Sequence, residues 1–374
     1  MKRTVLPATI LALLALGDVA PARQAHANGR LQIHFMDVGQ GDGAILISPQ
    51  GETVLFDNGV RNQCHRPVGY LSQLGVTRID YHVASHYHDD HIGCTAQVFN
   101  DFPLARQAFD RGGSYHTGTY KSYLSAVGTL RTTATTGQRF VLDSTSGNPV
   151  SIEFVSANGE GVKTTNENDL SLAAVVRFGQ FDAEIGGDLS GFKSGGYEDI
   201  ESLVVSRVGQ VEVYKVHHHG SRYSSNDTWL SGIRPRVAII SAGIDNPHHH
   251  PTSECMERLH IAGARTYWTS RGGEAEPEPE FDTVGGTIIV EVAPGAKDFT
   301  VRSSLLSTTD TYQVWGATPG PSPAQPPTVT YVWSKRSGVY HHPNCRYVAQ
   351  ISAENRESGA TPPAGKALHT GCPR

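Results

Sequence analysis

The sequence predicts a layered α/β protein with two β-sheets, followed by a small C-terminal module. Three observations support this class. Short apolar segments broken by Gly, Pro or Asp-Asn follow one another early in the chain and indicate a meander of strands. Further on, strand-like segments alternate with segments of helical periodicity, which is typical of sheets covered by helices. A Pro-rich polar stretch at 316–328 then separates the main body from a short tail.

The individual elements follow from apolar periodicity and from the turn residues between them. Strands are expected at residues 31–36, 43–48, 53–56, 79–84, 139–142, 151–156, 170–178, 181–185, 211–216, 237–241, 266–269 and 286–292. Helices are expected near 68–74, 120–127, 195–206, 225–231 and 253–262. The chain is expected to divide into a leader at 1–27, a main domain at 28–305, a linker at 306–328 and a Cys/His module at 329–374.

The N-terminus has the features of a secretory signal peptide. Lys2 and Arg3 precede an apolar run at 4–16, and Ala25-His26-Ala27 offers a small-x-small cleavage site. The run is shorter than the roughly 20 residues that a membrane span needs. A buried helix of the mature fold is the alternative, but Pro7 and Pro21 bracket the run unfavourably. We therefore expect a secreted or periplasmic protein, and no later segment reaches spanning length.

The composition excludes several classes of protein. Hydrophobic residues make up 38% of the chain, which is ordinary for a globular protein and excludes a disordered one. The formal net charge of −5 provides no strongly basic surface that would hold nucleic acid or anionic lipid by charge alone. The unusual feature is the 18 His residues, most of which lie in four clusters, at 82–91, 217–219, 248–250 and 341–369.

One of these clusters has the spacing of a metal site. The apolar segment 79–84 leads into His86, His88, Asp90 and His91, so four ligand-type side chains follow the end of a buried strand. Neutral imidazoles and carboxylates bind divalent ions of the zinc or manganese type. A polar loop that is rich in His by chance is the alternative, and the regular spacing after a strand disfavours it.

Further motifs follow in a fixed order around this one. The chain resembles the metallo-β-lactamase superfamily and, within it, the metallo-hydrolase domain of ComEC-like competence proteins and their secreted relatives. The resemblance covers about residues 31–292. It rests on FMDVGQGDG at 35–43, LFDNG at 55–59, HYHDDH at 86–91, NDLS at 168–171, GGD at 186–188, HHGS at 218–221, and Asn246 with His250-Pro251.

The resemblance implies an αββα sandwich with two divalent metal ions at one edge, Zn²⁺ or Mn²⁺. It places His86 and His88 at the first ion, Asp188 as a bridge between the ions, and Asp90, His91 and His219 at the second ion. The wider superfamily adds a third His to the first ion. Here Asn168 stands in the corresponding segment, and His116 lies too early, so the choice between zinc and manganese stays open.

The same resemblance suggests roles beyond metal binding. Asp90 would orient the attacking nucleophile, His218 would face the substrate, and His250 with Asn246 would bind phosphate or protonate a leaving oxygen. A solvated loop is the alternative for 248–250. Supporting roles fall to Asp57, which would accept from a ligand imidazole, and to Asp37, for which a turn role is equally compatible. Gln40 and Asp42 are expected either to support the same site or to form the turn, and His217 is expected on the other side of its strand or flanking the site.

Export permits disulfides, and the chain has five Cys residues. Cys64 and Cys94 both fall in loops beside the metal motif and are expected to pair. Cys255 lies in a helical pattern and is expected as a buried thiol.

The tail carries two His-x-x-Cys units, His342 with Cys345 and His369 with Cys372. Four such ligands suit a structural zinc ion that stabilises a module without a large core. The tail resembles the small Ada-type metal-binding modules, which carry more Cys. In an exported protein a Cys345–Cys372 disulfide is the favoured alternative.

These observations predict a secreted two-metal hydrolase that acts on DNA or a related phosphodiester through a hydroxide held between the ions. Three alternatives remain within the superfamily, namely an extracellular esterase, a phosphorylcholine esterase and a β-lactamase. An alternative of another class is a protein that binds a surface polymer and whose sandwich domain is catalytically inactive. The complete set of ligand-type residues disfavours this alternative.

Overall fold

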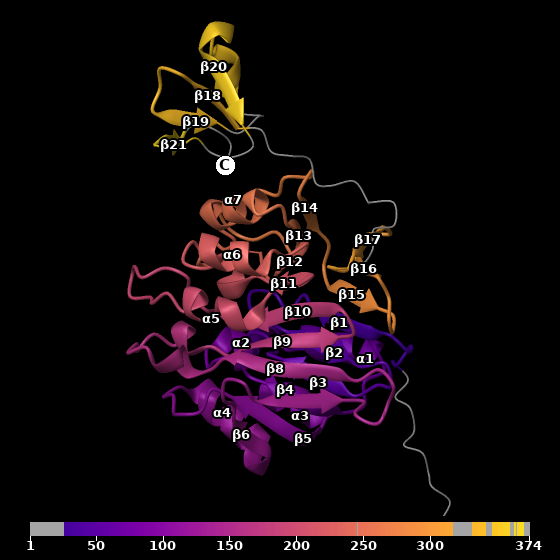
Figure 1. The fold of residues 1–374 in the computed structure, drawn as a ribbon. Coiled ribbons are helices and arrows are strands. Elements are labelled where there is room, and N and C mark those ends of the chain that lie inside the picture. Colours follow the sequence, from indigo (N-terminus) through magenta and orange to yellow (C-terminus); the bar gives the residue numbers. More distant parts are fainter. Residues whose placement is uncertain are drawn as a thin grey trace, which may run out of the picture.

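The computed structural model describes residues 26–244, 246–316, 331–341, 346–359, 363 and 365–369 (Figure 1). Two large sheets form the main body. The first has nine strands in the order β17-β16-β15-β1-β2-β3-β4-β5-β6. Its strands are β1 Leu31–Phe35, β2 Ala44–Ile47, β3 Thr53–Phe56, β4 Ile79–Val83, β5 Leu104–Asp110, β6 Arg131–Thr133, β15 Ile288–Val292, β16 Asp298–Ser303 and β17 Thr309–Gln313.

The second sheet has eight strands in the order β14-β13-β12-β11-β10-β9-β8-β7. Strands β10 to β14 run parallel to one another, whereas β7 to β10 form an antiparallel meander. The strands are β7 Arg139–Leu142, β8 Val150–Ser156, β9 Ala173–Phe178, β10 Phe181–Gly186, β11 Val213–Lys215, β12 Val237–Ile240, β13 Arg265–Trp268 and β14 Asp282–Val284.

Three apolar layers hold these elements together. The central layer combines side chains from both sheets, such as Ile33 and Leu46 from the first and Val176 and Ile239 from the second. Each outer layer joins one sheet to its helices. The first sheet packs against α1 His65–Gln73, α2 Asp89–Ile92, α3 Thr95–Asp101 and α4 Gly118–Val127, and the second against α5 Glu201–Val208, α6 Asp227–Ile233 and α7 Ser253–Ile261. The architecture is therefore the expected αββα sandwich.

Strand β1 shows how alternation produces these layers. Leu31, Ile33 and Phe35 face the central layer, while His34 points outward and its Nδ1 lies 2.8 Å from the hydroxyl of Tyr70 on α1. Because successive side chains of a strand point to opposite faces, a strand between two layers must be buried on both. All five residues of β1 are buried, as this position requires.

Three expected boundaries need correction. The helix expected at 195–206 begins only at Glu201, after a Gly-rich loop. The strand expected from 170 begins at Ala173, because Asn168–Leu170 forms a 3-10 turn. The linker cannot begin at 306, since β17 pairs with β16 along its whole length. Beyond β17, Trp315 donates from its backbone to Glu212 Oε1 at 2.6 Å, so the main body extends at least to this residue.

The Cys64–Cys94 disulfide is confirmed, with a Cα–Cα distance of 5.2 Å. It joins the residue before α1 to the residue before α3, on either side of the loop that carries the metal motif. Cys255 is a buried free thiol, as expected.

The tail forms a small four-stranded sheet in the order β20-β18-β19-β21, seen beyond α7 in Figure 1. Its strands are β18 Tyr331–Ser334, β19 Val339–His341, β20 Arg356–Gly359 and β21 Ala367–Leu368. Tyr340 donates its hydroxyl to Glu257 on α7 and so joins the tail to the main body. The ring of His369 stacks on that of His341 at 4.9 Å.

Several predictions fall outside the described residues. Residues His342, Cys345 and Cys372 lie there, so the zinc or disulfide of the tail stays a prediction. The same holds for the signal peptide up to residue 25. Within the described ranges, no helix combines the length and apolar character needed to cross a membrane.

Candidate metal centre

The predicted site residues come together where four strands end. The motif His86–His91 follows β4, Asp188 follows β10, the His217–Gly220 turn follows β11, and the loop with His250 follows β12. Strands β10, β11 and β12 are parallel, so their carboxyl ends meet at one edge of the second sheet. The carboxyl end of β4 brings the first sheet to the same edge, since Leu172 donates its backbone N–H to Ser85 O at 2.8 Å.

A first cluster of ligand-type atoms gathers around one oxygen of Asp188. His86 Nε2 lies 3.0 Å from His88 Nδ1 and 3.9 Å from Asp188 Oδ2. On the other side, His218 Nε2 also lies 3.9 Å from Asp188 Oδ2. The side-chain amide of Asn168 is 3.1 Å from His218 Nε2, so this residue borders the same cluster.

A second cluster gathers around the other oxygen of Asp188. His91 Nε2 lies 3.3 Å and His219 Nε2 lies 3.6 Å from Asp188 Oδ1. Asp90 completes the cluster, with one carboxylate oxygen 3.4 Å from His219 Nε2 and the other 4.0 Å from His91 Nε2. Asp188 therefore lies between the two clusters and gives one oxygen to each.

The donor atoms in both clusters fit divalent metal ions. His91 Nε2, His219 Nε2, Asp188 Oδ1 and Asn168 Oδ1 are buried and have no hydrogen-bond partner among the described residues. A buried polar atom without a partner is costly, and proteins rarely retain several of them in one place without a ligand. Imidazole nitrogens and carboxylate oxygens are also the donors that zinc and manganese bind.

Asp57 orients one imidazole of the second cluster. Its Oδ2 lies 2.8 Å from His91 Nδ1 and accepts from Ser85 Oγ at 2.6 Å, while its Oδ1 accepts from Ser85 N at 2.8 Å. With Nδ1 donating to this carboxylate, His91 presents a free Nε2 lone pair to the cluster.

The turn that carries His218 and His219 has an uncommon backbone conformation. Both residues have positive φ angles, 52° and 54°, which side chains with a Cβ rarely adopt. The consequence is that His218 points into the first cluster and His219 into the second. His217 points the opposite way, with Nδ1 2.8 Å from Glu201 Oε1 and Nε2 3.1 Å from Glu184 Oε1.

The charges of the site favour bound cations. Burial disfavours a charged His219, but the carboxylates of Asp42 and Asp188 outweigh burial and raise its pKa to about 10. Burial raises the pKa of the Asp188 carboxyl, yet the neighbouring imidazoles outweigh it and hold that pKa well below the ordinary value. The carboxylates that attract protons to these imidazoles attract metal ions in the same way.

Two expected site residues have other structural roles. Asn246 was expected among the catalytic residues, but its Oδ1 accepts from His250 N at 3.0 Å and its Nδ2 donates to His250 O at 2.7 Å. It therefore shapes the loop that carries His250. Asp37 accepts from Gly39 N at 3.1 Å and from Arg66 Nη1 at 2.9 Å, which is a turn and surface role.

His218 and His250 adjoin the site differently. His218 was expected to face the substrate. In the structure it lies at the first cluster, the position for which the superfamily has a third His ligand and this sequence offered only Asn168 in the corresponding segment. His250 is 8% exposed, and its ring centroid lies 5.1 Å from that of His218. Burial, with repulsion from His218 and His219, lowers the pKa of His250 to about 2, so its imidazole is neutral at pH 7.

The sequence interpretation gave Asp42 a supporting or a turn role but missed the residue that pairs with it. Asp42 lies behind the second cluster, 3.3 Å from His219 Nδ1, and is paired with Lys215. The Gly-Gln-Gly-Asp-Gly turn was a signal for Asp42, but nothing local marks Lys215 as its partner.

Two known proteins have sequences similar to part of this chain. The chain is 28% identical over 234 residues to Recombination protein 2 of Haemophilus influenzae, covering 61% of this chain and 26% of that protein. It is 23% identical over 261 residues to ComE operon protein 3 of Bacillus subtilis, covering 65% and 32% respectively. The chain thus spans about a quarter to a third of the length of these relatives. No protein-family model matches it.

Solved structures with similarity include metallo-β-lactamases. The enzyme of Cronobacter sakazakii has a TM-score of 0.34 and 15% identity, over 48% of this chain and 75% of that one. MEM-A1, a subclass B3 enzyme from a soil metagenome library, has a TM-score of 0.35 and 11% identity, over 50% and 77%. By its ordered motifs, its sandwich and its two clusters of ligand-type atoms around Asp188, the chain resembles the metallo-β-lactamase superfamily and its ComEC-like competence proteins.

Proposed function

We propose that this protein is an exported two-metal phosphodiesterase that cleaves DNA or a related phosphodiester. The observation that carries the proposal is the position of Asp188, whose two oxygens face separate clusters of ligand-type atoms. Two ions held this way lower the pKa of water and neutralise the charge that develops on the oxygens of a phosphoryl centre. Such a pair suits the displacement of an alkoxide from phosphorus.

The protein side chains divide the work. His86, His88 and His218, with the amide oxygen of Asn168, would hold the first ion. His91, His219 and Asp90 would hold the second. Three imidazoles at the first position favour zinc, whereas the carboxylates of Asp90 and Asp188 at the second make that position more favourable for manganese. We therefore propose zinc or manganese as the natural metal.

Asp90 and His250 are the candidates for contact with the substrate. The Asp90 side chain is 26% exposed, so it lies where the cluster opens to solvent and can orient an attacking water. The neutral imidazole of His250 carries a proton on one nitrogen and can donate a hydrogen bond from it to the leaving oxygen as negative charge develops there. Its buried Nδ1 has no hydrogen-bond partner, so no described residue fixes its tautomer.

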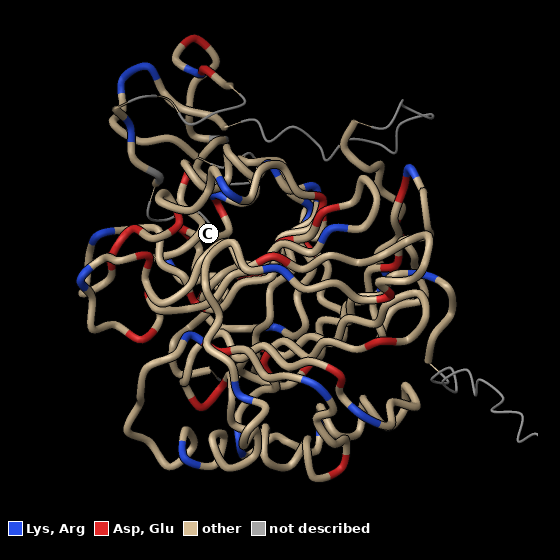
Figure 2. The backbone as a smooth tube through the Cα atoms, turned by 60° about the horizontal axis from the view of Figure 1, so that its bottom comes forward, with Lys and Arg blue, Asp and Glu red and all other residues tan. Residues whose placement is uncertain are grey.

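The DNA assignment rests on the relatives. Recombination is a process of DNA, and Recombination protein 2 is 28% identical to this chain over 234 residues. The charge distribution supplies no independent support, because Lys and Arg alternate with Asp and Glu along the chain (Figure 2) and the formal net charge is −5. The export assignment rests on the N-terminal sequence alone.

A turnover screen tests the proposal. Protein loaded with Mn²⁺ or Zn²⁺ is assayed against single- and double-stranded DNA, bis-p-nitrophenyl phosphate, a phosphorylcholine ester and a cephalosporin. We expect hydrolysis of the phosphodiesters, and its loss in Asp188→Ala protein. Cleavage of the cephalosporin without any phosphodiester would refute the proposal, and metal-loaded protein inert on every substrate would favour a binding protein.

A further inference from the structure

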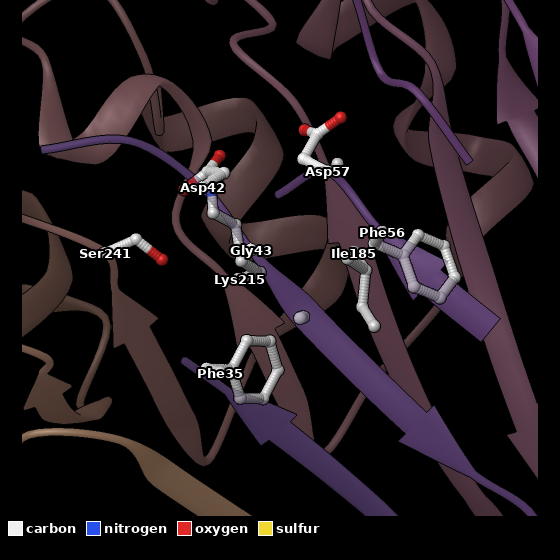
Figure 3. Close-up of a pocket in the computed structure, with 10 residues that line it drawn as sticks. Phe35, Asp42, Gly43, Phe56, Asp57, Ile185, Lys215 and Ser241 are labelled. Carbon is white, nitrogen blue, oxygen red and sulfur yellow. The ribbon is translucent and has the colours of Figure 1, made fainter. Parts of the chain in front are cut away.

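A buried ion pair lies directly behind the second cluster. Lys215 Nζ donates to Asp42 Oδ2, and the two side chains are 3% and 5% exposed. Lys215 is the last residue of β11, and Asp42 lies in the turn between β1 and β2 (Figure 3). The cavity beside them has a volume of about 10 Å³, the lower limit for one water molecule. The two charges therefore depend on each other, because little solvent can compensate them.

Asp42 reaches both imidazoles of the second cluster from behind. Its Oδ1 lies 3.3 Å from His219 Nδ1, and its Oδ2 lies 3.7 Å from His91 Nδ1. The Nε2 atoms of the same two rings point to Asp188. The first cluster has no comparable contact with Asp42, since His86 Nδ1 lies instead beside Ser85 Oγ at 3.1 Å. The charge of Asp42 therefore acts on one cluster only.

The turn of Asp42 also contacts the backbone of Asp90. The backbone N–H of Asp42 donates to Asp90 O at 3.1 Å. Gly41 has a φ of 134°, and a Cβ there would lie 2.2 Å from Asp90 O, so only glycine allows this approach. The turn thus fixes the chain at Asp90. The Asp42 carboxylate faces the rear nitrogens of both imidazoles, which are themselves hydrogen-bonded, His219 to Ser241 O at 3.0 Å and His91 to Asp57 Oδ2 at 2.8 Å.

We propose that Asp42, held in place by Lys215, positions the second cluster and sets its affinity for a metal ion. A carboxylate behind a ligand imidazole fixes the orientation of the ring and increases its basicity. Lys215 makes the buried carboxylate tolerable, because a buried charge without a partner is strongly destabilising. The inference rests on the two-metal site proposed above. Asp42 and Lys215 are positioning residues that contact neither the substrate nor the ions.

The test removes both charges together. Asp42→Asn/Lys215→Met protein contains no unpaired buried charge and is expected to fold. Its matched control is Asp182→Asn/Arg177→Met, which removes the ion pair between β9 and β10 at the opposite end of the second sheet. Zn²⁺ binding is followed by titration calorimetry, and Co²⁺ binding by visible absorption, with circular dichroism and thermal melting as measures of folding.

We expect the double variant to bind the second ion about 10- to 100-fold more weakly while the first ion binds as in the wild type. The Co²⁺ spectrum should lose the contribution of one site, and the control should behave as wild type. Normal binding of both ions would show that Asp42 is only a turn residue. Equal weakening of both ions with a lower melting temperature would show a general structural role. Wild-type protein that binds fewer than two ions would instead overturn the proposed two-metal site itself.

Discussion

His91 Nδ1 lies 2.8 Å from Asp57 Oδ2, and this contact turns the Nε2 atom of the same ring toward Asp188. Asp57 directly follows β3, and His91 lies in α2, which comes after β4, the parallel neighbour of β3 in the first sheet. A contact between the end of β3 and this helix thus determines which nitrogen His91 offers to a metal ion.

Replacement of Asp57 should weaken the second cluster. Asp57→Asn keeps the shape and tolerates the positive φ of 46° at this position, but it removes the charged acceptor for His91. We expect metal affinity at one site to fall about 10- to 100-fold, measured by titration with Zn²⁺. Asp37→Asn is the matched control, because that carboxylate contacts Arg66 and no cluster residue. Equal effects of the two substitutions would contradict the assignment.

Replacement of Asp188 should remove more than one ion. Asp188→Asn retains one oxygen acceptor and replaces the other oxygen by an amide nitrogen, so a single side chain can no longer serve both clusters. We expect metal content, measured by elemental analysis, to fall by at least one ion per chain together with phosphodiesterase activity. Full metal content with retained turnover would contradict a bridging position.

His250 should affect chemistry without affecting metal content. In His250→Gln protein we expect kcat on DNA to fall about 10²- to 10³-fold, because the positioned hydrogen-bond donor to the leaving oxygen is displaced. Bis-p-nitrophenyl phosphate releases a stable phenolate that needs little stabilisation, so its hydrolysis should change much less. His248→Gln serves as the control on the exposed side of the same loop. The same loss on both substrates would contradict this contact with the leaving oxygen.

The disulfide should stabilise the region around the metal motif. Cys64→Ser/Cys94→Ser opens a link between residues 30 positions apart, and we expect the free energy of unfolding to fall by about 2–5 kcal/mol. Thermal melting with and without reductant measures the effect. Wild-type protein should lose stability in reductant and the double variant should not. A reductant effect of equal size in both proteins would show that the loss of stability does not come from this disulfide.

Glu212 should make stability depend on pH. Burial raises its pKa to about 7, against favourable hydrogen bonds from Asp182 N and Trp315 N. The folded state therefore binds the proton more tightly than the unfolded state. The protonated Glu212 side chain thus adds to the free energy of unfolding, fully so below about pH 4.5, and this added stability is lost as pH rises through 7. Between these values wild type should lose on the order of 1–3 kcal/mol of stability relative to Glu212→Gln, because the buried carboxyl holds its proton more tightly than the unfolded chain does. Parallel melting curves from pH 4.5 to 8 would contradict this.

Much of the fold and of the candidate site could be predicted from local sequence patterns. Alternating and continuous apolar segments predicted most strands of both sheets, and the segment 79–84 located the motif His86–His91 at a strand end. The strands β16 and β17 were not predicted. In β16 the buried side chains alternate with polar ones that are exposed or half-buried, and in β17 all side chains are exposed or half-buried, so both strands carry a weak apolar signal. The linker boundary was placed too early for that reason.

Sequence by itself determined which residue types were available for metal binding, and in which order they follow strand ends. Only the tertiary structure decided how these residues are divided between the two clusters. His218 and His219 are neighbours in sequence, yet two positive φ angles send them to different clusters. Asp42 and Lys215 are 173 positions apart, and they meet because the turn after β1 packs against the end of β11. The physical reason is that strand periodicity is a local property, whereas the partner of a buried charge is set by strand pairing and sheet packing across the whole chain.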